Sequence, residues 1–206
     1  MQVNAEREGV GSKGEATRQR IIQHALELAG RVGLEGLSIG DLAHELGLSK
    51  SGLFAHFKSK ERLQLDVLDT AAELFRARVF EPALRKRRGE ERLVALFENC
   101  VKWINARNLP GGCVYIAGAF EWDDRQGPVR QRVVEWFDKF HMALVRAARQ
   151  TRDEHQFAAE VDVEQFANDL HAILMKYHLE ARLMRNKKAL PRARHAFERL
   201  LADARG

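Results

Sequence analysis

The chain has 206 residues, of which 45% are hydrophobic and 31% charged, proportions that exclude a disordered protein and favour a folded one with a sizeable core. Its net charge of +5 is compatible with a polyanionic partner but does not identify one. The cysteines Cys100 and Cys113 have neither metal-motif nor disulfide-scaffold spacing, so we expect a reducing compartment and no structural zinc site.

The N-terminal segment is polar and glycine-bearing. Residues 1–14 lack the apolar core of a signal peptide, and no uncharged run in the chain approaches the length of a membrane span. We therefore expect residues 1–12 to form a loose arm, and the protein to be cytoplasmic and without membrane attachment.

Apolar residues recur at helical spacing in the first part of the chain and predict four helices. Serines suited to helix N-caps precede the second, third and fourth of these helices. The last of the four is expected to end or kink at a proline. With their flanking residues, these helices are expected from about Lys13 to Gly33, Ser38 to Gly47, Ser49 to Phe57, and Ser59 to Pro82.

The remainder predicts longer helices separated by short turns. They are expected at Glu90–Ala106, Cys113–Trp122, Pro128–Thr151, Asp162–Asn186 and Leu190–Ala204. The pattern therefore predicts an all-α fold of about nine helices. A basic run, Arg85–Arg88, lies between two of them, and a solvated connector is favoured over a nucleic-acid patch.

Two short helices joined at Gly47 have the spacing of a helix-turn-helix. Glycine permits a positive φ at the turn, and Ala43 is small where the helices cross. The apolar side of the second short helix is expected to hold Leu53, Phe54 and Phe57. Its outward positions carry no acid between residues 49 and 60, so its positive N-terminal end is suited to a DNA major groove.

A longer pattern surrounds this motif. It includes Thr17-Arg18, Gly33, Leu37-Ser38, Asp41-Leu42-Ala43 and the whole run from Leu46 to Glu61. This pattern resembles the DNA-binding domain of the TetR family of transcription regulators. It departs at Phe54, where the family often has a tyrosine whose hydroxyl can reach a phosphate.

The resemblance implies a three-helix DNA-binding domain in residues 1–62, joined by a long helix to a helical effector-binding and dimerisation domain in residues 63–206. It also implies a homodimer on a palindromic operator, usually a repressor, whose affinity for double-stranded DNA falls when a small-molecule effector binds.

Particular residues follow from the resemblance and from their chemistry. Thr17 and Ser38, at or near helix N-termini, are expected to bind phosphate, as are Lys60 and His56. Lys50 and Ser51 are the candidates for base edges. The full set of expected DNA contacts is Thr17, Ser38, Lys50, Ser51, Gly52, Ala55, His56 and Lys60. An alternative for Ser38, Ser49 and Ser59 is that they only cap helices.

The last two helices carry apolar faces that resemble the family's four-helix dimer interface. An internal core packed against the middle helices is the alternative for the same residues. The expected interface residues are Phe166, Leu170, Ile173, Leu174, Tyr177, Ala181, Phe197 and Leu200.

Aromatic residues of the middle helices are candidates for an effector pocket, although aromatics at helical spacing are more often plain core. The candidates are Phe97, Cys100, Trp103, Phe120, Trp122, Phe137, Phe140, His141 and Tyr177. Cys113 is either a redox switch or, more simply, an inert buried thiol.

Other function classes have little support. The chain has no nucleophile elbow, phosphate-binding loop or dinucleotide fingerprint, so we expect no enzyme and no cofactor. His171 and His178 lie two turns apart without a further ligand nearby, so no metal site is expected. One alternative stays open: a DNA-binding protein whose C-terminal part docks a protein partner rather than a small molecule.

Overall fold

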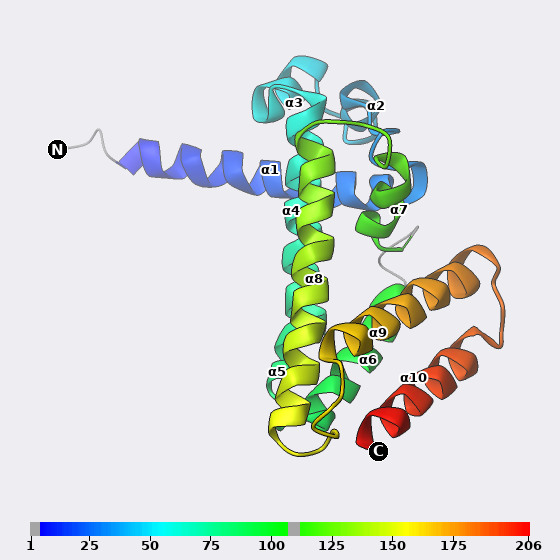
Figure 1. Ribbon diagram of the computed structural model, residues 1–206. Helices are drawn as coiled ribbons and strands as arrows, with labels where there is room; N and C mark the ends of the chain where they lie inside the picture. The colour runs from blue at the N-terminus through cyan, green and yellow to red at the C-terminus, as the bar shows by residue number, and fades with distance from the viewer. Residues whose placement is uncertain (1–4, 107–111) are drawn as a thin grey trace. The chain divides into compact units, whose positions relative to one another are not determined.

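The computed structural model describes residues 5–106 and 112–206, and every regular element within these ranges is helical (Figure 1). The α-helices are α1 (Ala5–Val32), α2 (Ile39–Glu45), α3 (Lys50–Phe57), α4 (Lys60–Phe75), α5 (Glu81–Leu84), α6 (Glu90–Ile104), α7 (Val114–Glu121), α8 (Pro128–Asp153), α9 (Val163–His178) and α10 (Ala189–Arg205). Two π-helical segments, η1 (Arg76–Phe80) and η2 (Leu179–Leu183), join α4 to α5 and extend α9.

Counted as continuous runs, the described residues form nine helices, which confirms the predicted all-α fold. The basic run Arg85–Arg88 lies in the connection between α5 and α6, where Arg88 pairs with Asp153 at 3.3 Å and Glu154 at 3.2 Å. In the described part of the chain, no helix combines the length and apolar character needed to cross a bilayer.

Helix α1 begins at Ala5, so the prediction of a loose arm through residue 12 is wrong for residues 5–12, whereas residues 1–4 lie outside the described part. Residues 5–8 are alanine, glutamate and arginine, all strong helix formers. The glycines that follow cost about 1 kcal/mol each relative to alanine, which weakens a helix without ending it. The helix ends where predicted, at Gly33, whose φ of +82° suits glycine.

The helix does not end at Pro82, where an end or kink was predicted. Instead it contains a π-helical segment, a turn wider than that of an α-helix, directly before the proline. Proline has no N–H, and its ring excludes the carbonyl group four residues earlier. In η1 the N–H of Glu81 donates to the carbonyl of Arg76, five residues back, and the helix continues to Leu84. π-Helical turns are rare and are often found at functional sites.

The structure divides into two compact units. The first, here called the head, takes in residues up to Ala71 together with Val114–Val133, and the second, the body, comprises Ala72–Cys113 and Val134–Gly206. The division differs from a single cut after residue 62 because α7 belongs to the head. Within the head, the hydroxyl of Tyr115 in α7 donates to the carbonyl of Leu68 at 2.9 Å.

The core of the head draws buried side chains from each of its first four helices. Ile21 and Ala25 of α1, Leu42 of α2, Leu53 of α3 and Leu63 of α4 are all completely buried. The periodic apolar positions of the sequence therefore converge on one small core, and the polar faces of the short helices point away from it.

An aromatic cluster lies at the centre of one side of the body. Phe75 packs edge-to-face against Phe80, Trp103, Trp136 and Phe140, with ring centroids 5.2 to 5.5 Å apart. Edge-to-face packing of this kind adds roughly 0.5–1.5 kcal/mol per pair beyond the burial of area. The cluster therefore ties the end of α4 to α6 and α8.

Candidate nucleic-acid interface and ligand cavity

The turn between α2 and α3 has the backbone geometry of a helix-turn-helix. Gly47 has a φ of +64°, a left-handed conformation that glycine adopts at little steric cost. The N–H of Leu48 donates to the carbonyl of Ala43 at 2.9 Å and closes the turn. Leu42 and Leu53, one on each helix, are 0% exposed. The predicted motif is present in the structure.

Each serine predicted to cap a short helix accepts a hydrogen bond from the backbone N–H three residues later. Such a bond satisfies one of the free donors at a helix start and is typically worth about 1 kcal/mol. The three bonds join Ser38 to Asp41 (3.4 Å), Ser49 to Gly52 (3.0 Å) and Ser59 to Arg62 (3.0 Å). The start of each helix is therefore fixed by its own sequence.

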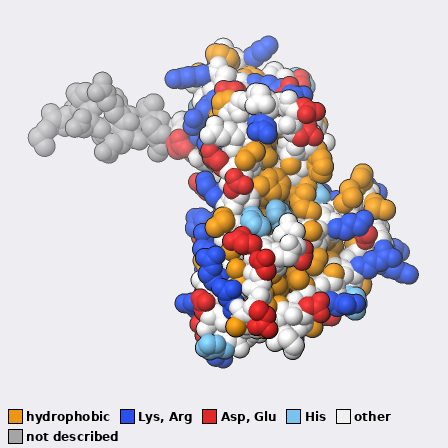
Figure 2. All heavy atoms as spheres, viewed as in Figure 1, with side chains coloured by type: hydrophobic (Ala, Val, Ile, Leu, Met, Phe, Trp, Pro, Cys, Tyr) orange, Lys and Arg blue, Asp and Glu red, His pale blue; other side chains and the backbone are white. Residues whose placement is uncertain are grey.

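The outward face of α3 is polar and cationic. Lys50, Ser51, Gly52 and Ala55 are exposed, and His56 is half-buried. The first turn of the helix contains no acidic residue. Figure 2 shows basic side chains over α3 and its surroundings. This combination suits an approach to phosphates and base edges.

Phe54 does not lie on the apolar side of α3, where it was expected, and its side chain is 52% exposed. Leu53 and Phe57 are four residues apart and share the buried face, and a residue directly after Leu53 is turned about 100° away from it. An exposed ring on the outward side of this helix can contact thymine methyl groups or sugars. The strict i, i+4 spacing is the signal that separates Phe54 from the core.

Thr17 lies in the interior of α1, well beyond the first turn of a helix that begins at Ala5. Thr17 therefore does not lie at or near a helix N-terminus, where it was predicted, and its contact with DNA stays a prediction from the family pattern. Its neighbour Arg18 forms an ion pair with Asp66 and lies over the ring of Phe57, 5.4 Å from the centroid. Arg18 thus anchors α1 within the head.

Lys60 contacts Glu35, an acidic residue in the turn between α1 and α2. Its ammonium group bonds the carbonyl of Glu35 and lies 3.2 Å from the carboxylate of the same residue, whose other oxygen is 3.1 Å from Arg125. Partial burial acts to raise the pKa of Glu35, but hydrogen bonding and charge from Lys60 and Arg125 outweigh it and hold that pKa below its ordinary value. Glu35 therefore competes with any phosphate for Lys60, a feature that the sequence pattern does not reveal.

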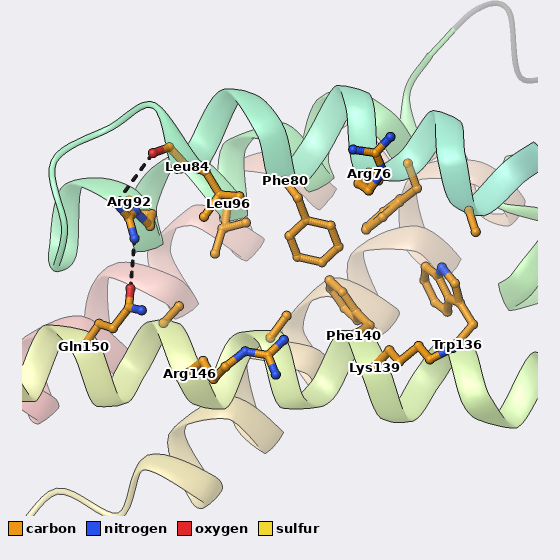
Figure 3. Close-up of a pocket in the computed structure, with 14 residues that line it drawn as sticks. Arg76, Phe80, Leu84, Arg92, Leu96, Trp136, Lys139, Phe140, Arg146 and Gln150 are labelled. Carbon is orange, nitrogen blue, oxygen red and sulfur yellow. Dashed lines mark hydrogen bonds between the residues drawn. The ribbon is translucent and has the colours of Figure 1, made fainter.

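The body contains a cavity of about 450 Å³ beside η1, a size within the range of small-molecule sites, roughly 300–1,000 Å³ (Figure 3). It is lined from the end of α4 through η1 and α5, and by α6 and α8. Its apolar walls are formed by Phe75, Phe80, Leu84, Leu96, Trp136 and Phe140.

Of the predicted pocket residues, Phe140 lines this cavity. Phe97, Cys100, Trp103 and Tyr177 are buried in the core of the body instead. Phe97, for example, stacks on a ring of α10 with centroids 4.2 Å apart. These side chains therefore lie in the hydrophobic core, as in the alternative given for aromatic residues at helical spacing.

The other predicted pocket residues lie elsewhere. Phe137 and His141 are half-buried on α8, both with ring contacts to His171. Phe120 and Trp122 belong to the head, where Phe120 is 72% exposed. None of these four is among the residues that line the cavity.

The sequence carried a signal for the cavity in α8. Trp136, Phe140, Ala143, Ala147 and Gln150 follow one another at three- and four-residue intervals, and all of them line it. Two of these residues are alanines, whose small side chains leave room that larger residues would fill. Only the opposing helices, distant in sequence, show that the room exists.

The predicted dimer seam divides into two groups. Phe166, Leu170, Leu174, Tyr177 and Phe197 are buried within the single chain, so the internal-core alternative accounts for them. Three residues, Ile173, Ala181 and Leu200, are half-exposed and stay available to a partner.

A groove of about 400 Å³ runs between α9 and α10, which lie side by side in Figure 1. It is lined mainly by small or apolar residues, including Ala172, Ile173 and Ala196. Beyond it, exposed hydrophobic side chains continue at the C-terminal end of α9 (Figure 2). There Leu183 is 75% exposed and Met184 59%. An apolar face of this kind is characteristic of an interaction surface.

Both cysteines are buried. Burial, with a smaller effect from the neighbouring Cys113, raises the pKa of the Cys100 thiol far above its ordinary value. A thiol that stays protonated is a poor nucleophile, so the position of Cys100 favours the inert alternative. Among the described residues, no three His, Cys, Asp or Glu side chains gather as a metal site would require.

Two family models match the chain. The model described as "Bacterial regulatory proteins, tetR family" matches residues 21–67, which span α2, α3 and their surroundings. The model described as "Tetracyclin repressor-like, C-terminal domain" matches residues 89–197, more than half of the chain. The two matches correspond to the helix-turn-helix region and to most of the helices after it.

Individual relatives agree with the family models. The tetracycline repressor protein class C of Escherichia coli is 45% identical over 56 residues, a match that covers 27% of this chain and 24% of that protein's length. A crystal structure of a TetR transcriptional regulator from Chloroflexus aurantiacus is 28% identical with a TM-score of 0.82, covering 93% of this chain and 95% of that one. A regulator from Cytophaga hutchinsonii, 22% identical, also has a TM-score of 0.82, with 93% and 96% covered, and shows the same fold.

Proposed function

Because the chain belongs to the TetR family of bacterial transcription regulators, we propose that it is a cytoplasmic homodimer that binds a palindromic operator and represses transcription until a small-molecule effector binds. The observation that carries this proposal is the outward face of α3, which is exposed and free of acids behind a glycine turn. Two such helices in a symmetric pair would read the two halves of a palindrome.

In the proposed complex, base-edge contacts come from the start of α3. Lys50 can donate to the O6 and N7 atoms of guanine, and Ser51 can bond to several bases. Gly52 and Ala55 allow close approach because they add little bulk. Phosphate contacts are assigned to Thr17, Ser38, His56 and Lys60.

The proposed dimer surface is the exposed part of α9, η2 and α10. It comprises the half-exposed Ile173, Ala181 and Leu200, together with the alanine-lined groove between the two helices. Small side chains in this groove allow the helices of a second copy to approach closely, and closed two-fold pairing buries the same face on both copies.

The cavity in the body is the proposed effector site, and this favours a small molecule over a docked protein as the controlling partner. An effector changes DNA affinity only if it binds one arrangement of the dimer more tightly than another. Helices α4 and α8 contribute residues to both head and body, so the coupling is proposed to run along them.

Alanine variants at two lysines test the DNA interface. Lys60→Ala should weaken binding to all duplexes and reduce the slope of log affinity against log salt by about 1, because one phosphate contact is lost. Lys50→Ala should instead reduce discrimination between operator variants at particular base pairs, by roughly 1–3 kcal/mol for each lost base contact. Lys187→Ala, an exposed lysine of the body, is the control that should leave both unchanged.

The operator itself should be recoverable by selecting genomic fragments with the purified protein and measuring binding at several salt concentrations. We expect a two-fold symmetric sequence. A monomeric protein with no preference among duplex fragments at low salt would overturn the proposal.

A further inference from the structure

The cavity in the body carries an unbalanced charge. Four of the side chains that line it are cationic, Arg76, Arg92, Lys139 and Arg146, and none is an aspartate or glutamate. The same helices supply the apolar and largely aromatic part of the lining, so cations and rings lie next to one another around the cavity. A site that combines positive charge with ring faces selects a ligand that has both an anionic group and a flat apolar part.

Arg92 holds one end of the cavity (Figure 3). One terminal nitrogen donates to the side-chain oxygen of Gln150 at 3.0 Å, and the other to the carbonyls of Leu84 (3.5 Å) and Lys86 (3.2 Å). Its Nε is buried and lacks a hydrogen-bond partner in the described structure. A buried donor without an acceptor is costly, which favours an acceptor supplied by a ligand.

The remaining cations differ in how far the chain neutralises them. Arg76 forms an ion pair with Glu81. Lys139 and Arg146 are exposed, line the same cavity from α8, and have no ion-pair partner among the described residues. In Figure 3 the side chains of both residues are drawn beside Phe140. Two unpaired cations on one helix therefore stand beside an aromatic wall.

The π-helical segment η1 supplies Arg76 and Phe80 to this lining. A widened turn changes the angular positions of the residues around it, so an ordinary α-helix would present different side chains here. The distortion thus coincides with the cavity, and Pro82 next to it maintains the distortion.

We infer that the cavity binds an organic anion with an aromatic or similarly flat apolar body, such as an aromatic carboxylate or sulfonate. This inference rests on the proposed function only in treating the cavity as the effector site. The rings of Phe80, Trp136 and Phe140 take the apolar body, and Arg92, with Lys139 and Arg146, takes the anionic group.

The test uses two dyes that differ in one group. 8-Anilinonaphthalene-1-sulfonate carries a sulfonate, and N-phenyl-1-naphthylamine is its uncharged parent. Fluorescence titration of the purified full-length protein, without DNA, gives both dissociation constants. We expect the anionic dye to bind at least about tenfold more tightly, which corresponds to one charge-assisted hydrogen bond. Equal affinities, or tighter binding of the uncharged dye, would overturn the inference.

Variants place the binding in the cavity. Replacing both α8 cations, Lys139→Gln with Arg146→Gln, should weaken the sulfonate dye about tenfold and leave the uncharged dye unchanged. Arg149→Gln removes the same charge from the same helix outside the lining and should change neither. Ala143→Trp fills the cavity and should abolish binding of both. Sulfonate binding that survives both the double variant and Ala143→Trp would overturn the inference.

The outcome for the cavity is separable from the outcome for the proposed regulator. Operator binding with no preference for the anionic dye would retain the DNA-binding function and reject this ligand class. Preferential anion binding by a protein that ignores duplex DNA would support the cavity assignment and reject the regulator. Retained dye selectivity in Lys60→Ala, a change in the head, would show that the two readouts are independent.

Discussion

The head and the body present their functional surfaces in opposite ways. In the head, six of the eight proposed DNA contacts lie between Lys50 and Lys60, on α3 and at the start of α4, and the start of α3 is fixed by its own cap. In the body, the cavity is assembled from residues between Ala72 and Gln150 on five helical segments, α4, η1, α5, α6 and α8. A local surface can be derived from spacing and capping alone, whereas an assembled one depends on which helices meet.

The largest effect is expected from a change in the core that supports the local surface of the head. Leu53 is fully buried on the inner face of α3. Leu53→Ala should lower the free energy of unfolding by about 2–5 kcal/mol because it leaves a cavity in a small core. Operator affinity should fall with it, since α3 loses the contact that orients it. Chemical denaturation followed by circular dichroism measures the stability.

The control is the next residue. Phe54 is half-exposed, so Phe54→Ala should change the free energy of unfolding by about 0.5 kcal/mol or less. Any loss of DNA affinity in this variant would then report a direct contact. If Phe54→Ala destabilised the protein as much as Leu53→Ala, the assignment of Phe54 to the outward face would be wrong.

The same contrast explains how much could be predicted. The helices, the turn at Gly47 and the caps at Ser49 and Ser59 follow from interactions within a few residues, and the structure has them. The cavity does not follow in the same way, because Phe97 and Phe140 look alike as members of apolar helical stripes. Only the packing of distant helices decides that Phe97 stacks on Phe197 in the core, whereas Phe140, also buried, borders the cavity.

The residues of the predicted interface divide into two groups for a related reason. Periodicity finds the apolar stripe of α9 but not the angle at which it divides between the core and the surface. Leu170 and Leu174 point into the chain, while Ile173, between them, is half-exposed. A partner can thus reach only a minority of the residues in the stripe. Which residues these are depends on how α10 packs against α9.

A variant at Ile173 tests whether the accessible part of the α9 stripe forms the dimer interface. Ile173→Asp places a charge at the edge of the proposed dimer seam, and two-fold symmetry introduces it twice. We expect the dimer dissociation constant to rise at least about 100-fold, the effect of losing a buried contact on each side of the interface. The stability of the monomer should change little, because the side chain is half-exposed. Sedimentation equilibrium over a range of concentrations measures the dissociation constant.

Met142→Asp is the matched control, an exposed apolar residue of α8 in the same unit. It should leave the dimer intact. A protein that stays dimeric with Ile173→Asp but dissociates with Met142→Asp would move the interface from the α9 and α10 face to α8.

The smallest expected effect concerns a contact of the head that is assembled from distant residues, that of Glu35 with Lys60 and Arg125. The pKa of Glu35 lies below its ordinary value of 4.5, so the folded protein binds this proton more weakly than the unfolded chain. The stabilisation is therefore fully present above the unfolded pKa and is lost as the pH falls through the folded one. Since the group is largely exposed, the total should stay below about 1 kcal/mol.

Glu35→Gln tests two effects of this contact: its contribution to stability and its competition with phosphate for Lys60. The stability difference from the unmodified protein should be measurable at pH 7 and should shrink toward zero near pH 3. The same variant removes the competitor of Lys60, so its operator affinity at low salt should rise at neutral pH even as stability falls. A drop in affinity would mean that Glu35 positions Lys60 for the phosphate instead of withholding it, and the surface of the head would then depend on long-range contacts as the cavity of the body does.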